Sequence, residues 1–120
     1  MNMRRTAMML ALLALCAPGP FCRGAVTPAR TIVVHAHRYA FEPAEITVKT
    51  GETVQLQLIS DDVPHSLLIK ELGINQDMTK GHPVEISLTA AHPGDYQGRC
   101  GRFCGGGHGH MTFVVHVTGN

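Results

Sequence analysis

The sequence predicts an all-β protein, a Greek-key β-sandwich or barrel of about seven strands. Three observations carry this prediction. Short segments alternate apolar and polar residues or are rich in β-branched residues, and turn residues separate them every several positions. No long segment has the apolar periodicity of an amphipathic helix. The 120 residues, 44% of them hydrophobic, are enough for a single domain with a packed core.

The first residues have the pattern of a secretory signal peptide. Two arginines precede an apolar run over residues 7–17, and this run is too short to span a bilayer. Proline and small residues that follow offer a cleavage site. We therefore expect a signal peptide over residues 1–24 and one domain over residues 25–120, which is periplasmic or secreted and has no transmembrane segment. An uncleaved membrane tether and a lipid anchor on Cys16 are the alternatives.

The first half of the domain predicts three strands. Residues 31–37 are rich in β-branched side chains and favour the first strand. After an irregular crossing over residues 38–44, residues 45–49 alternate as a second strand. Residues 53–59 alternate apolar and polar almost perfectly, which is typical of a strand with one buried and one wet face.

The second half predicts four more strands, at residues 65–69, 84–88, 96–99 and 111–117. Each is a short apolar or alternating segment next to Gly, Pro or polar turn residues. The segment over residues 70–81 has no clear period and has room for a turn of helix. Short strands joined by turns are the pattern of a two-sheet sandwich.

One segment near the C-terminus concentrates side chains that bind soft metals. From Cys100 to Met111 the chain carries two thiols, two imidazoles and a thioether, and it includes the pattern C-x3-C-x3-H-x2-M. Sulfur and imidazole together select copper or zinc, and a thioether beside thiolates favours copper. Glycines between the ligands let the loop turn tightly around one point. His65 follows a mid-chain loop, and in a sandwich such a loop can meet this one.

Loss of the signal peptide would simplify both the cysteines and the charge. Cys100 and Cys104 would be the only thiols left, so the domain has no disulfide framework. Without Arg4, Arg5 and Arg23 the ten basic residues become seven, against nine acidic residues, which is a net charge of −2. The domain therefore has no basic footprint for nucleic acid.

The residues alone leave other interpretations of the motif open. The two thiols could form a disulfide in an oxidising compartment, and two Cys with two His could bind zinc. A mononuclear type 1 copper site would use His65, Cys104, His108 and Met111, and Cys100 would not bind the metal. His110 could also take the place of His108.

The remaining histidines are interpreted as ordinary strand or surface residues: His35, His37, His82, His92 and His116. Met78 is interpreted as a packing residue. Asp61 and Asp62 are interpreted as a solvated loop, although they could orient His65 from behind.

These segments together resemble a known family. The stretch over residues 41–54, then Asp62-Val-Pro-His65-Ser, then the C-terminal loop are similar to a cupredoxin. The two-cysteine loop is similar to the copper A domain of cytochrome c oxidase subunit II and to the corresponding domain of nitrous oxide reductase. The resemblance covers nearly all of the domain and implies a cupredoxin-like fold.

The resemblance also implies a dinuclear copper centre, with a single copper as the alternative. Cys100 and Cys104 would bridge two copper ions. His65 and His108 would each bind one ion, and Met111 would be a weak axial ligand of one of them. Members of the family accept electrons from a cytochrome c at this centre and pass them to a haem.

A further ligand implied by the resemblance is the backbone carbonyl of Arg102, which would bind the other copper weakly. The side chain of Arg102 stands where oxidases usually carry an acidic residue that helps to bind magnesium, and Trp is absent. The two transmembrane helices of the oxidase subunit are also missing. We therefore expect a stand-alone electron carrier without turnover of its own, whose partner is a redox protein such as a c-type cytochrome or terminal oxidase. A copper storage or delivery protein is the alternative, and an oxidase subunit is a third.

Overall fold

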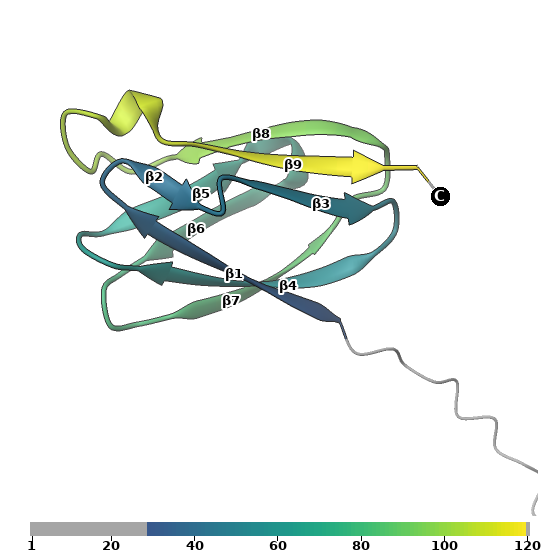
Figure 1. Cartoon of the computed structure of the whole chain (residues 1–120), viewed down its shortest axis with the longest axis horizontal. Helices are drawn as coiled ribbons and strands as arrows, with labels where there is room; N and C mark the ends of the chain where they lie inside the picture. Colours follow the sequence, from purple (N-terminus) through teal and green to yellow (C-terminus); the bar gives the residue numbers. More distant parts are fainter. Residues whose placement is uncertain (1–28, 120) are drawn as a thin grey trace, which may run out of the picture.

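The computed structural model describes residues 29–119, so the predicted signal peptide and its cleavage site lie outside the described residues. Within these residues, nine strands form two sheets that face each other (Figure 1). The predicted all-β sandwich is therefore confirmed, with two strands more than the sequence indicated. Within residues 29–119, no helix has the length and apolar character that crossing a membrane requires.

The first sheet has four strands. Its order is β2 (Ala40–Glu42), β1 (Arg30–His37), β4 (Thr53–Ser60) and β7 (Val84–Thr89). β1 runs antiparallel to β2 and parallel to β4, and β4 runs antiparallel to β7. The parallel pair arises because the chain crosses to the other sheet and back between β1 and β4.

The second sheet has five strands. Its order is β3 (Glu45–Lys49), β9 (Thr112–Thr118), β8 (Gly94–Cys100), β5 (His65–Ile69) and β6 (Ile74–Met78). β3 and β9 run parallel to each other. The remaining neighbours in this sheet, β9 with β8, β8 with β5 and β5 with β6, are antiparallel. β8 and β9 thus lie side by side, with the metal-ligand loop between them.

Two of the strands, β2 and β6, were not predicted. β2 has only three residues and lies in the segment interpreted as an irregular crossing. β6 is an edge strand with the sequence Ile-Asn-Gln-Asp-Met, in which three consecutive polar residues hide the alternation. The three-residue 3-10 turn η1 (Lys70–Leu72) precedes β6 in the segment that had room for a turn of helix.

The core lies between the sheets, as the alternation predicts. The buried side chains of β4 include Leu56 and Leu58, and those of β9 include Phe113 and Val115. Phe41 on β2 meets Phe113 edge to face, with ring centroids 5.8 Å apart. This packing holds the two sheets together next to the loop that carries the ligands.

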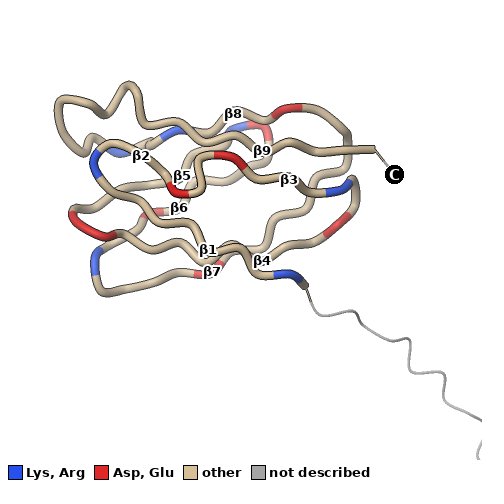
Figure 2. Tube along the Cα trace, viewed as in Figure 1, with Lys and Arg blue, Asp and Glu red and all other residues tan. Residues whose placement is uncertain are grey.

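The ligand loop lies at one end of the sandwich. The short 3-10 turn η2 (His108–His110) and the β1–β2 turn lie at this end, and the C-terminus lies at the other (Figure 1). Over residues 29–119, Lys and Arg are interspersed with Asp and Glu along the trace (Figure 2). The distribution agrees with the absence of a basic footprint in the composition.

Candidate metal centre

Two neighbouring strands bring the first ligands together. β5 begins at His65 and β8 ends at Cys100, and the antiparallel register places Leu67 opposite Cys100. His65 lies two residues before Leu67, so its side chain leaves the sheet on the same face as that of Cys100. The N–H of Cys100 donates to the carbonyl of Met111 over 3.0 Å, which closes the ligand loop at its base.

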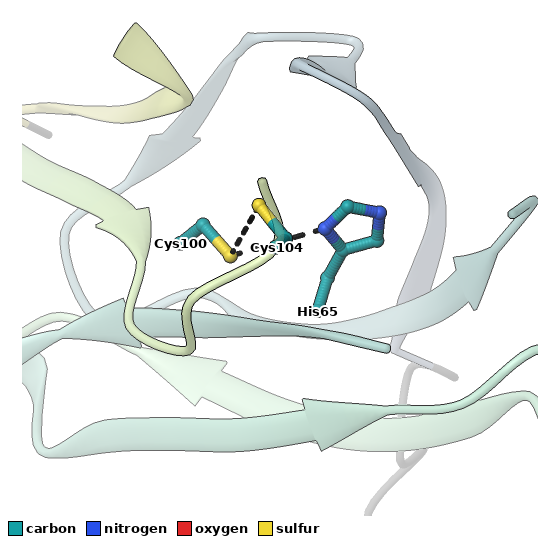
Figure 3. A group of neighbouring side chains, drawn as sticks. All are labelled: His65, Cys100 and Cys104. Atoms are coloured by element: carbon teal, nitrogen blue, oxygen red, sulfur yellow. Dashed lines mark hydrogen bonds between the residues drawn. The ribbon is translucent and has the colours of Figure 1, made fainter. Parts of the chain in front are cut away.

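Three buried side chains converge on one point (Figure 3). The ligand atoms of His65, Cys100 and Cys104 all lie within 4.8 Å of one another. The two sulfur atoms are 3.6 Å apart, and Nδ1 of His65 is 3.9 Å from Sγ of Cys100. The sulfur separation is well beyond the ~2.05 Å of a disulfide bond, and both cysteines are free.

Three further groups surround the two sulfur atoms. Nδ1 of His108 lies 3.7 Å from Sγ of Cys104, and Sδ of Met111 lies 3.8 Å from the same sulfur. The carbonyl oxygen of Arg102 lies 3.0 Å from Sγ of Cys100. The structure thus places the other four predicted ligand groups around the pair of predicted thiol ligands.

The two histidines of the loop lie differently. His108 and His110 stand at either end of η2, but only the ring of His108 is near a thiol. His110 is exposed, whereas His108 is half-buried and Met111 is fully buried. The geometry therefore favours His108 over His110 as the ligand from this loop.

Asp62 fixes the orientation of His65. Oδ1 of Asp62 lies 2.7 Å from Nε2 of His65, and its two oxygens also accept the backbone N–H groups of Val63 and Arg38. Partial burial disfavours the carboxylate, but these hydrogen bonds outweigh it and lower the pKa of Asp62 to about 2. An ionised acceptor keeps the proton on Nε2, which leaves the lone pair of Nδ1 directed at the thiols.

The thiol of Cys104 holds its proton in the absence of metal. Burial, then the hydrogen bond with Cys100 and the charge of Cys100, raise the pKa of Cys104 to about 11, although Arg38 acts in the opposite direction. A metal ion must therefore displace a proton to bind the thiolate. Such a thiol stays protonated in solution and becomes a thiolate when a metal ion binds it.

Two residues of the β1–β2 turn support the loop and were not predicted. Nε of Arg38 donates to the carbonyl of Cys104 over 3.0 Å. The ring of Tyr39 packs against Gly105 and Gly107, where any side chain would clash with it, and Gly105 has a φ of +134°. Glycines inside the motif were the only sequence signal that another group packs closely there.

The surface next to the ligands is partly apolar. Phe103 is 78% exposed, and its ring centroid is 5.8 Å from that of His108. A shallow groove of about 340 Å³ lies beside Phe103, Pro64 and Arg38. An exposed aromatic side chain beside a candidate metal ligand is unusual for a solvated loop and suits a contact surface.

The other histidines and acids lie apart from the thiols. His35 bonds with Asp61, His37 lies against Glu42, and His116 lies between Asp95 and Glu45. Asp62, rather than Asp61, therefore contacts His65. Met78 is buried in the core, in agreement with a packing role, and His82 and His92 are exposed.

Comparison with known proteins relates the whole chain to one group. The family described as "Cupredoxin-like domain" matches residues 5–113. Cytochrome c oxidase subunit 2 of Thermus thermophilus is 30% identical over 87 residues, which are 72% of this chain and 64% of that protein. The chain spans 30% to 64% of the length of the curated relatives that match it.

Solved structures agree with the sequence comparisons. The periplasmic domain of cytochrome oxidase subunit II (CoxB) of Bradyrhizobium japonicum superposes with a TM-score of 0.70 at 20% identity, covering 79% of this chain and 88% of that one. A chain of a heme-copper terminal oxidase dimer has a TM-score of 0.67 at 25% identity, covering 74% and 65%. The first of these likenesses, below 25% identity, is a likeness of fold.

Proposed function

Because this chain belongs to the cupredoxin-like domain family, we propose that it is an exported electron-transfer protein with a dinuclear copper centre. It is a cytochrome c oxidase subunit II-like cupredoxin domain whose His and Cys side chains lie close enough together to bind copper. The observation that carries the proposal is the pair of buried thiols, 3.6 Å apart, with two imidazoles, a thioether and a carbonyl around it.

The donor set fits copper better than its rivals. Thiolates, imidazoles and a thioether are ligands that copper accepts together, whereas zinc makes little use of a thioether. In the proposed centre Cys100 and Cys104 would hold the two ions together with His65 and His108, whose rings lie next to the thiols. Met111 and the carbonyl of Arg102 complete the set as weak ligands. Bound copper would supply one-electron redox chemistry.

The chain's own contribution is a rigid, dry cage. Cys100, Met111 and His65 are fully or almost fully buried, so the protein excludes water from most of the site. Asp62 holds the ring of His65, and the hydrogen bond from Cys100 to Met111 holds both ends of the loop. Ligands fixed in this way move little when the charge of the centre changes, and small rearrangement favours fast electron transfer.

The relatives support the proposed compartment and partner. The Bradyrhizobium structure is a periplasmic domain, and the second structure is a terminal oxidase. These comparisons support a periplasmic location after cleavage of residues 1–24 and a redox partner such as a c-type cytochrome or a terminal oxidase. Phe103, which is exposed beside His108, supports docking of that partner at the ligand end.

The test is to load the protein with copper and to measure metal content and the electron paramagnetic resonance spectrum together. Two coppers per chain, with hyperfine splitting from one electron shared by two nuclei, are expected. One copper with a single-nucleus signal would show that Cys100 does not bridge two ions and that the centre is mononuclear. Zinc alone, or an intact disulfide that binds no metal, would overturn the copper assignment.

Two variants separate the ligands. Cys100→Ser should abolish the shared-electron signal while a mononuclear site on the remaining ligands can persist, and unchanged metal content and colour would contradict the bridging role. His110→Gln is the matched control, because His110 is exposed and should leave the spectrum unchanged. Release of copper to a chelator tests the storage or delivery alternative, since a closed cage should release it slowly.

A further inference from the structure

A second group of metal-ligating side chains lies on the outer face of the first sheet. His35 and His37 are two residues apart on β1, so both side chains project from the same face. Both are accessible, with side chains that are 44% and 34% exposed. Two carboxylates, Asp61 and Glu42, contact these rings. We call these four residues the β1 histidine patch.

Strand register places the two His–carboxylate pairs of the β1 histidine patch side by side. His35 lies directly opposite Glu42 of β2, yet Glu42 contacts His37, with Oε1 3.2 Å from Nε2. On the other side, Asp61 follows the last residue of β4, and its Oδ1 lies 2.9 Å from Nδ1 of His35. The backbone N–H of Asp61 donates to the carbonyl of Ala36, between the two histidines, over 2.9 Å.

Each of the two imidazole rings makes a hydrogen bond through Nδ1. Nδ1 of His35 faces the carboxylate of Asp61, and Nδ1 of His37 lies 3.2 Å from the carbonyl oxygen of Arg38. An ionised carboxylate and a carbonyl can only accept a hydrogen bond, so Nδ1 carries the proton in each ring. In the neutral ring of His35, Nε2 then holds the lone pair, which is how metal-binding histidines are oriented. Nε2 of His37 lies 3.2 Å from Oε1 of Glu42, so a metal ion would have to displace the proton that these two groups share.

We propose that His35, His37 and Glu42 bind a divalent transition-metal ion of the Cu(II) or Zn(II) type at the surface of β1. Two imidazoles and a carboxylate suit both ions. Side chains two residues apart on a strand start about 7 Å from each other, a span that two metal–nitrogen bonds of about 2.1 Å and two rings can close. Among the described residues only the buried centre has its donor atoms gathered at one point, so binding at the β1 histidine patch requires these accessible side chains to rotate.

The surface site and the buried centre use separate ligands at the same end of the sandwich. His37 is followed by Arg38, whose Nε donates to the carbonyl of Cys104 over 3.0 Å. Asp61 is followed by Asp62, which holds His65. The two sites therefore adjoin each other but share no ligand, and the surface site stands whether or not the buried thiols bind copper.

The test uses the full chain with all four cysteines changed to serine (Cys16→Ser, Cys22→Ser, Cys100→Ser and Cys104→Ser), so that thiolate binding cannot mask the surface site. Cu(II) is added stepwise and followed by calorimetry and electron paramagnetic resonance. We expect a Cu(II) signal with superhyperfine splitting from two imidazole nitrogens and no thiolate absorption. Adding His35→Gln and His37→Gln should remove this signal, and adding Asp61→Asn should weaken binding by about 10–100-fold.

The matched control adds His82→Gln and His92→Gln, which remove two exposed histidines elsewhere and should leave the signal intact. Equal Cu(II) binding in the β1 variant and in this control would overturn the proposal. The same titration with Zn(II) by calorimetry shows which ion is preferred, and failure of both ions to bind the protein with intact histidines would also overturn it.

A second measurement does not depend on the folding of the variants. In the wild-type chain, Cu(II) beyond the amount that the thiol centre takes up should broaden the amide resonances of β1 and β2 near His35, His37 and Glu42 before those of β7. If this further broadening is centred on another part of the chain, the assignment is overturned. Failure of the dinuclear copper proposal would appear instead in the thiolate absorption of the wild-type protein, so the two results are distinguishable.

Discussion

Nε2 of His65 lies 2.7 Å from Oδ1 of Asp62, and this contact determines which nitrogen of the ring faces the thiols. Because the pKa of Asp62 is lowered to about 2, the carboxylate stays ionised throughout the neutral range and keeps the proton on Nε2. The orientation of a proposed metal ligand is thus set by a residue three positions earlier in the same loop.

Asp62→Asn should weaken copper binding. The asparagine amide carries no charge, and its NH2 group faces one of the N–H groups from which Asp62 now accepts a hydrogen bond. The proton of His65 is then no longer held on Nε2. We expect a rise in the copper dissociation constant of about 10–100-fold, measured by competition with a chelator. Asp61→Asn is the control at the thiolate centre, since Asp61 contacts His35 instead. Equal affinity in Asp62→Asn and wild type would show that the contact is dispensable.

Met111→Leu should keep copper bound and raise the reduction potential. The side chain is fully buried, and leucine fills a similar volume at a cost in stability of less than about 1.5 kcal/mol. Loss of a weak sulfur donor destabilises the oxidised centre, so the potential rises. Voltammetry of the loaded protein measures it. The buried residue Met78, changed to Leu, is the control, and complete loss of copper in Met111→Leu would contradict an axial role.

Gly107→Ala should destabilise the ligand loop. A Cβ at this position would clash with the ring of Tyr39, whereas a Cβ on Gly106 meets nothing within 4 Å. We expect Gly107→Ala to lower the free energy of unfolding by about 1–3 kcal/mol in denaturant titrations, as overpacking does. Gly106→Ala is the matched control. Adding Tyr39→Ala to the first variant should remove most of its effect, and equal loss with or without Tyr39 would rule out the clash.

Phe103→Ala should slow electron exchange with the partner without changing the copper centre. The side chain is 78% exposed, so truncation should leave the cage, the metal content and the potential unchanged. Exposed aromatic residues contribute strongly to docking surfaces. Stopped-flow mixing with a reduced c-type cytochrome measures the rate. Val33→Ala removes another exposed apolar side chain, from β1, and an equal rate change in both variants would argue against a specific contact.

His116 should make the stability of the domain depend on pH. The hydrogen bond with Asp95, then that with Glu45, raise the pKa of His116 above its ordinary value of 6.5. A raised pKa means that the folded state binds the proton more tightly. The stabilisation is therefore complete below pH 6.5 and is lost as the pH rises through the raised pKa.

Thermal unfolding from about pH 6 to about pH 8.5 measures this effect. His116 of β9 contacts carboxylates of β8 and β3, so its protonated form connects three strands. His116→Gln should flatten the pH dependence that the wild type shows in this range. His92→Gln, a change at an exposed histidine, should keep it, and an unaltered profile in His116→Gln would contradict the assignment.

The sequence predicted the strands whose residues alternate clearly, including the edge strands β3 and β7, and missed β2 and β6. β4 and β9 alternate over seven or eight residues because one side of each packs in the core. β2 has only three residues, and β6 has three consecutive polar residues, so neither leaves a clear period. Local alternation indicates burial of one face only where a strand is long enough and its exposed and buried residues differ in polarity.

The candidate site was predictable where its residues are close in the chain or match the family resemblance. Cys100, Cys104 and Met111 belong to one motif, and the resemblance identified His65 from far along the chain. Arg38 could not be predicted, because its contact with Cys104 joins residues 66 positions apart and depends on how β1 meets the ligand loop. The carboxylate partners of His35 and His37 likewise depend on strand register.

The hydrogen bond between the N–H of Cys100 and the carbonyl of Met111 marks the boundary between the ligand loop and the paired strands β8 and β9. Only loop and the short turn η2 lie between these residues, and β8 and β9 pair on the other side of them. A change in the number or kind of residues inside the loop can therefore alter which metal is held, and how many ions, without altering the strands. Metal specificity and fold can diverge independently in proteins built on this plan.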